Sequence, residues 1–88
     1  MIVKIDKSFE KDFKKISDEK LRNKLLDIII SIQKAIKISD LKNIKKLQGT
    51  KDFYRIRLGD YRLGIIINKK EVQLIRLLHR KEIYRYFP

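Results

Sequence analysis

The strongest constraint on the fold is an alternating stretch between residues 53 and 68 that is interrupted by the dipeptide Gly59-Asp60. On each side of this dipeptide an apolar or aromatic side chain stands at every second position, which is typical of strands with one buried face. Glycine in the first of two turn positions favours a two-residue β-hairpin turn. The pattern therefore predicts a hairpin made of strands 53–58 and 61–68.

This hairpin register separates apolar from cationic side chains. The apolar face, which helices should cover, holds Tyr54, Ile56, Leu58, Tyr61, Leu63, Ile65 and Ile67. Arg55, Arg57 and Arg62 share the other face, and Arg57 stands directly opposite Arg62. Like charges in that position are unfavourable unless an anion lies between them. The pattern fits an anion site as well as it fits an ordinary solvated face.

The first half of the chain is expected to form one strand and two helices. The β-branched residues near the start predict a short strand over residues 1–6. Apolar side chains every three or four residues predict a helix that Ser8 caps and a second helix that Ser17 caps and that ends near Lys37. Together they form a helical hairpin with one apolar face.

The second half is expected to be mostly strand. Residues 38–52 are polar and basic and are expected to be a loop. A third strand is predicted over residues 72–79, followed by a short helical turn or an extended tail over 80–88. The order β-α-α-β-β-β, with a short final helix, predicts an α+β fold whose helical hairpin packs on one face of a mainly antiparallel four-stranded sheet.

Composition narrows the class of function. The 88 residues predict a single domain, residues 1–88, and 23 Lys+Arg against 11 Asp+Glu give a net charge of +12. Such a charge favours a polyanionic partner, although it also serves solubility. Cysteine is absent and histidine occurs once, which argues against disulfides and against a structural metal site. Charges interrupt the longest apolar stretch, so no membrane partner and a cytoplasmic location are expected.

The C-terminal third carries the residues that suit chemistry. All but one of the arginines follow residue 50, and arginine binds phosphate oxygens two at a time. His79, at the end of a predicted strand, is the one side chain with an unperturbed pKa near neutrality. Tyr84 and Tyr86 can stack on bases or pin the C-terminus, and for Phe87 the packing role is favoured.

Three sequence motifs resemble the RelE/ParE toxin superfamily. They are KLQG at residues 46–49, YRIRLGDYRL at residues 54–63 and HRKEIY at residues 79–84. The resemblance implies a RelE-like fold and a metal-independent endoribonuclease, an mRNA interferase that needs no cofactor and usually cuts mRNA on the ribosome. It further implies an acidic RelB-like antitoxin that neutralises the toxin, in an assembly that can reach a heterotetramer.

The same resemblance implies roles for individual residues. Arg62 looks like the phosphate-binding arginine of the family, and Arg55 and Arg57 match positions that are basic there. Arg80 resembles the arginine that steadies the leaving group, and Tyr84 resembles the tyrosine that stacks on or orients the substrate.

The proton acceptor and the branch of the superfamily stay open in the sequence. Arginine cannot readily take up a proton, so His79 is the best candidate for a general base and Glu82 a weaker one. Two other functions compete with RNA cleavage. One is inhibition of DNA gyrase by a ParE-like toxin, and the other is RNA binding without chemistry.

Overall fold

The computed structural model describes residues 1–88 and confirms the predicted α+β class. The elements in chain order are β1 (Ile2–Ile5), α1 (Lys7–Lys14), α2 (Glu19–Lys34), the 3-10 helix η1 (Ile38–Asp40), β2 (Ile44–Lys46), β3 (Phe53–Leu58), β4 (Tyr61–Asn68), β5 (Glu71–His79) and α3 (Arg80–Tyr86). None of the helices combines the length and apolar character that a membrane span requires.

The sheet has five strands in the order β1-β5-β4-β3-β2, with β1 parallel to β5 and the other pairs antiparallel. The predicted count of four strands was therefore wrong by one. The additional strand, β2, lies inside the segment 38–52 that was expected to be a loop, and η1 lies there too. β2 has three residues, of which Ile44 alone is apolar, so the alternation is too short to be visible in the sequence.

The predicted hairpin register is confirmed. Leu58 pairs with Tyr61, Arg57 with Arg62, and Arg55 with Gly64. Gly59 has a φ of 60°, the left-handed conformation that the first turn position needs. The register places Arg57 and Arg62 side by side on one face of the sheet.

The helix caps differ from the prediction by one or two residues. Asp6, not Ser8, caps α1, and its carboxylate accepts hydrogen bonds from the backbone N–H and the hydroxyl of Ser8. These bonds lower the pKa of Asp6, because they stabilise its charged form. Asp18, not Ser17, caps α2. In both cases the adjacent carboxylate is the stronger acceptor for the N–H groups at the start of the helix.

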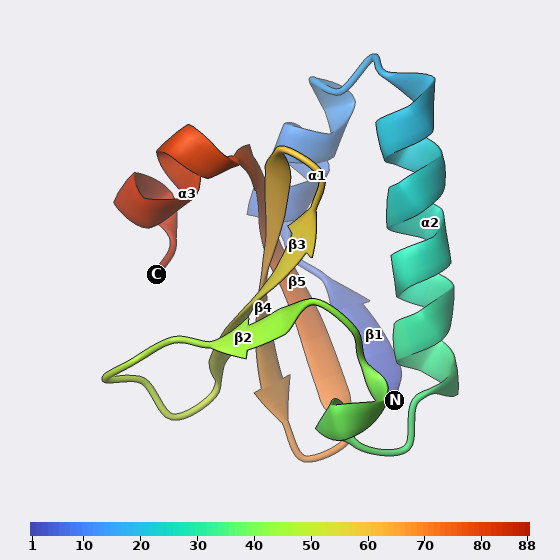
Figure 1. Ribbon diagram of the computed structural model, residues 1–88, viewed down its shortest axis with the longest axis vertical. Helices are drawn as coiled ribbons and strands as arrows, with labels where there is room; N and C mark the ends of the chain where they lie inside the picture. The colour runs from blue at the N-terminus through green and yellow to red at the C-terminus, as the bar shows by residue number, and fades with distance from the viewer.

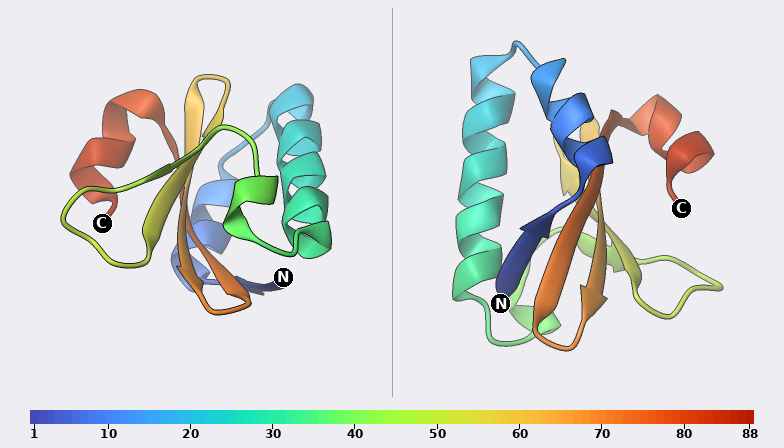
Figure 2. Two further views of the ribbon diagram at one scale, coloured as in Figure 1. Left: turned by 60° about the horizontal axis from the view of Figure 1, so that its bottom comes forward. Right: turned by 180° about the vertical axis from the view of Figure 1, so that it is seen from behind.

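Helices cover both faces of the sheet, but unequally. Figures 1 and 2 show α1 and α2 on one side and α3 alone on the other. The main core lies between α1, α2 and the sheet and includes the fully buried Leu25, Ile32 and Leu63. A separate small cluster under α3 contains Leu47, Ile83 and Phe87, and is here called the α3 cluster. Beside it, part of the sheet face opposite α2 stays open.

Candidate functional site

Four of the predicted site residues lie together in a hollow on the open sheet face, namely Arg55, Arg57, Arg62 and Tyr84. This arginine hollow has a volume of about 300 Å³. Its lining residues are Asn43, Ile44, Lys45, Arg55, Arg57, Arg62 and Tyr84. No acidic side chain is among them, so nothing in the hollow neutralises its arginines. Such a site attracts anions, and two of its arginines, Arg57 and Arg62, stand directly opposite each other.

Arg62 is fixed by the hairpin turn. Its Nη1 donates hydrogen bonds to the carbonyl oxygens of Gly59 at 2.8 Å and Tyr61 at 2.9 Å. A guanidinium has five N–H donors, and the other nitrogens of Arg62 make no hydrogen bond within the protein. The turn therefore orients the side chain and leaves donors free for an anion.

Tyr84 stands over the edge of the arginine hollow. The guanidinium carbon of Arg55 lies 4.3 Å from the centroid of the Tyr84 ring, which is a cation–π contact. The tyrosine is nevertheless 73% exposed. An exposed ring beside phosphate-type donors suits a ligand that carries both a flat base and a phosphate.

The α3 cluster positions this ring. Ile83 is fully buried and Phe87 is 3% exposed, so α3 is anchored on both sides of Tyr84. The Phe87 ring packs over Gly64, where an added Cβ would lie 2.7 Å from the ring atoms. The favoured packing role of Phe87 and the helical alternative for the C-terminal segment are both confirmed.

We expect Gly64→Ala to loosen α3, because the new methyl group occupies the place of the Phe87 ring. Overpacking of this kind costs about 1–3 kcal/mol. Limited proteolysis should then cut within residues 80–88 of the variant while the main core, which Phe87 does not enter, stays folded. The double variant Gly64→Ala/Phe87→Leu should recover part of the loss. If it is less stable than Gly64→Ala alone, a steric conflict is not the cause.

His79 does not lie in the arginine hollow. Its ring packs edge-on against Tyr61 at 5.6 Å between centroids, and both residues belong to the sheet face that α1 and α2 cover. Its Nδ1 accepts the Lys81 N–H at 3.2 Å and so caps α3. His79 instead lines a second hollow, which Asp12 and Ile16 also line.

Arg80 and Glu82 also lie outside the arginine hollow. Arg80 is the first residue of α3, and its side chain is exposed and forms no ion pair. Its backbone N–H donates to the Asp60 carbonyl at 2.7 Å, which fixes the start of α3 to the β3–β4 turn. Glu82 lines the same hollow as His79.

Two polar residues of the arginine hollow were missed by the sequence analysis, as was the apolar Ile44. Asn43 and Lys45 come from β2 and the residue before it, and Lys45 pairs with Arg55 across the strands. The one signal in the sequence is the basic composition of residues 42–46, which cannot tell a strand from a loop.

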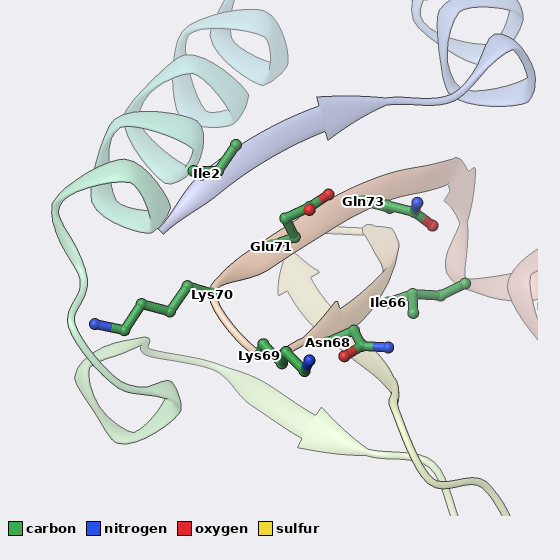
Figure 3. Close-up of a pocket in the computed structure, with 7 residues that line it drawn as sticks. All are labelled: Ile2, Ile66, Asn68, Lys69, Lys70, Glu71 and Gln73. Atoms are coloured by element: carbon green, nitrogen blue, oxygen red, sulfur yellow. The ribbon is translucent and has the colours of Figure 1, made fainter.

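A larger hollow, of about 570 Å³, lies at the opposite end of the sheet beside the β4–β5 turn. Figure 3 shows its side chains diverging, with Lys70 extending away from Asn68 and Gln73. Glu71 offsets the charge of the lysines there. A hollow without converging donors is a poor candidate for chemistry, despite its size.

The fold and the arginine hollow together define a small basic α+β protein with an acid-free cationic hollow on one face of its sheet. Residues 3–84 match the family described as the ParE toxin of type II toxin–antitoxin systems. The chain is 43% identical to Toxin RelE3 of Methanocaldococcus jannaschii over the full length of both proteins. The chain therefore belongs to the RelE/ParE superfamily of type II toxins, as its motifs predicted.

Solved structures agree with this assignment. A chain of the RelB-RelE antitoxin-toxin complex from Methanococcus jannaschii superposes with a TM-score of 0.82 and 40% identity, covering 97% of this chain and 99% of that one. The archaeal RelE-RelB complex from Pyrococcus horikoshii OT3 gives a TM-score of 0.73 at 28% identity, over 90% and 93% of the two chains.

Proposed function

We propose that this toxin is an mRNA interferase, a metal-independent endoribonuclease that cuts mRNA on the ribosome. One observation carries the proposal, namely the acid-free hollow that Arg55, Arg57 and Arg62 line together with an exposed tyrosine, which Arg55 contacts. Three arginines can stabilise the negative charge that builds up on a phosphate during attack, and the tyrosine ring can stack on an unpaired base. Membership of a toxin superfamily that includes RelE supports the same function.

In the proposed reaction, the ribose 2′-hydroxyl oxygen attacks the adjacent phosphorus and gives up its proton to solvent water. The bond from phosphorus to the 5′-oxygen of the next nucleotide breaks, and that oxygen takes up a proton from solvent water. The products are a 2′,3′-cyclic phosphate and a 5′-hydroxyl. Arg62 and Arg57 stabilise the charge on the non-bridging oxygens, and Arg55 holds Tyr84 against the base.

Arg80 is the residue proposed to steady the departing 5′-oxygen. Its side chain is free of protein partners at the start of α3, next to the β3–β4 turn that orients Arg62. An exposed guanidinium without protein partners can turn toward the leaving oxygen once RNA is bound, because contacts at catalytic sites often tighten only when the substrate is present.

The role of His79 as a general base, which the sequence suggested, can be tested directly. Because its ring lies across the sheet from Arg57 and Arg62, we expect the rate per folded His79→Gln molecule to stay within about tenfold of the parent rate. Loss of a general base would cost about 10²–10⁴-fold. The pH–rate profile should also keep its shape in the variant. A loss in the larger range, with removal of an inflection of the pH–rate profile near neutral pH, would establish His79 as the base instead.

The experiment that tests the proposed function is cleavage mapping on translating ribosomes. Purified protein is added to a translation reaction, and the new mRNA ends are sequenced and tested for a cyclic phosphate. New ends at defined codon positions support the interferase. If the protein stops translation but the mRNA stays intact, the result would support RNA binding without chemistry and contradict the interferase.

The match to the ParE family makes gyrase inhibition the second candidate function. The arginine hollow favours RNA as the target. A toxin that acts by contacting gyrase does not need arginines gathered in one hollow beside an exposed tyrosine ring. A supercoiling assay separates the two. Inhibition of gyrase at protein concentrations that leave mRNA intact would overturn the interferase.

We further propose a RelB-like antitoxin as the partner, with mRNA and the ribosome as targets. With a net charge of +12, this chain should associate fastest with an acidic segment, and the association rate should fall steeply as salt screens the charges. Stopped-flow mixing with the co-purified product of a neighbouring gene measures this. A basic partner whose association rate ignores salt would contradict the expectation.

A further inference from the structure

The α3 helix carries a second tyrosine, Tyr86, on the flank opposite Tyr84. Residues two positions apart in a helix are separated by about 200° around its axis, so the two side chains leave α3 on opposite sides. The guanidinium carbon of Arg76 lies 5.6 Å from the centroid of the Tyr86 ring. The corresponding distance from Arg55 to the Tyr84 ring is 4.3 Å. An arginine of the sheet therefore contacts each flank of α3.

Arg76 is itself fixed by α1. The Asp12 carboxylate accepts hydrogen bonds from Arg76 Nε at 2.7 Å and from Arg76 Nη2 at 3.1 Å. A bidentate pair of this kind fixes the plane of the guanidinium as well as its place. Arg55, in contrast, forms no ion pair. The guanidinium that contacts Tyr86 is therefore the more firmly oriented of the two.

α1 comes within reach of this arginine because β1 is short. β1 pairs with β5 only as far as Leu74, and α1 lies beside the part of β5 that follows. There the Ser8 hydroxyl donates to the Ile75 carbonyl, and the Asp12 carboxylate accepts the Leu77 N–H at 2.9 Å. The helix thus takes the place of a strand at this edge and brings a buried carboxylate to the arginine that contacts α3.

α3 depends on such contacts for its orientation. It has seven residues, too few to form a stable helix alone, and it is the one helix on its face of the sheet (Figure 2). The α3 cluster that anchors it has three buried side chains. Apolar burial is non-directional, so the cluster resists lifting of α3 more than rotation about its axis. Cation–π contacts on both flanks oppose that rotation.

We propose that Arg76, oriented by Asp12, is a positioning residue for the reaction. It holds Tyr86 and, through α3, keeps the Tyr84 ring at the edge of the arginine hollow, which Arg76 itself does not line. The inference rests on the proposed function, because it gives Tyr84 a part in binding the substrate. It connects α1, which lies outside the arginine hollow, to the geometry of the site.

The first test changes Tyr86, because this leaves the pair between Asp12 and Arg76 intact. Tyr86→Leu should raise the KM for ribosome-bound mRNA about two- to fivefold, the range that corresponds to one exposed cation–π contact. A purely structural loss would instead reduce the amount of folded enzyme, and so lower the apparent kcat with KM unchanged. Tyr86→Phe keeps the ring and should keep the parent KM. A Tyr86→Phe protein as impaired as Tyr86→Leu would overturn the proposal.

A Tyr84→Ala background shows whether Tyr86 acts through Tyr84. Tyr86→Leu should raise KM no further in a protein that already lacks the Tyr84 ring, since the two residues are then steps of one path. If the two increases in KM multiply as independent losses do, Tyr86 does not act by positioning Tyr84.

A measurement without RNA separates failure of this inference from failure of the proposed function. In protein labelled with 3-fluorotyrosine at its four tyrosines, the ¹⁹F resonance of Tyr84 is assigned by its absence from Tyr84→Phe. This resonance should shift in Tyr86→Leu and in folded Asp12→Asn, which breaks the bidentate pair, and stay in place in Tyr86→Phe. An unchanged resonance in Tyr86→Leu or Asp12→Asn would overturn the positioning. A shifted resonance in a protein that cuts no mRNA would support the contacts and overturn the proposed function alone.

Discussion

Replacing Arg62 by alanine should lower the rate of mRNA cleavage by about 10²–10³-fold, the usual cost of removing one oriented donor from a transition-state site. The turn carbonyls of Gly59 and Tyr61 already hold this guanidinium in place, so it needs no reorganisation when charge develops on the phosphate. The loss should appear mainly in kcat, because the contact strengthens as the phosphate becomes more negative.

Two further variants show whether charge or geometry is responsible. Arg62→Lys keeps the positive charge but loses the planar fork, so it should recover only part of the rate. Arg85→Ala removes an exposed arginine from α3 that lies outside the two hollows lined by Arg55 and Tyr84. This variant should cut at the parent rate. Rates are compared per folded molecule, because losing the two turn contacts also lowers stability slightly. An Arg62→Ala protein as fast as Arg85→Ala would remove Arg62 from the mechanism.

The hairpin that carries this site was predictable because its information is local. A two-residue turn with glycine first fixes the register of both strands, and the register then fixes the face of each side chain. Arg57 opposite Arg62 follows from that alone. The tertiary structure added little to this prediction, because only one orientation of the hairpin buries its apolar face.

The position of His79 could not be predicted, because a bulge in β5 decides it. Gly64 pairs with Arg76 but Ile65 pairs with Leu74, so Ile75 is an extra residue. A one-residue slip moves every following side chain to the other face of a sheet. Without the bulge, His79 would share a face with Arg62, whereas with it His79 packs on Tyr61.

β2 and the α3 cluster were unpredictable for a different reason. The three residues of β2 are a strand only because β3 offers its edge, and Lys45 joins the site through that pairing. Likewise, nothing near Gly64 in the sequence shows that the Phe87 ring covers it. Contacts between segments this far apart in the chain depend on the whole fold, and they supply both Lys45 and the position of Tyr84.

The bulge in β5 is held by a buried ion pair whose loss should have the largest effect on stability. Asp12 of α1 is 4% exposed, and its carboxylate accepts from Arg76 Nε at 2.7 Å and from Nη2 at 3.1 Å. It also accepts the backbone N–H of Leu77 at 2.9 Å. The bond to Asp12 raises the pKa of Arg76 while burial opposes it. Because the pKa of Arg76 is raised, the stabilisation that comes from its charge is present at neutral pH and is lost as the pH rises through the pKa of the folded state.

We expect Asp12→Ala to lower the free energy of unfolding by about 3 kcal/mol, at the lower end of the range for breaking a buried pair. The lower end applies because the Arg76 side chain is 25% exposed and can recover some hydration, whereas the Leu77 N–H loses its partner in a buried position. Urea unfolding of the two single variants and of Asp12→Ala/Arg76→Ala closes a double-mutant cycle. The double variant should be clearly more stable than the sum of the two losses predicts, because it no longer contains an unpaired charge. Strict additivity, or an Asp12→Ala protein as stable as its parent, would mean that the pair does not hold α1 to β5.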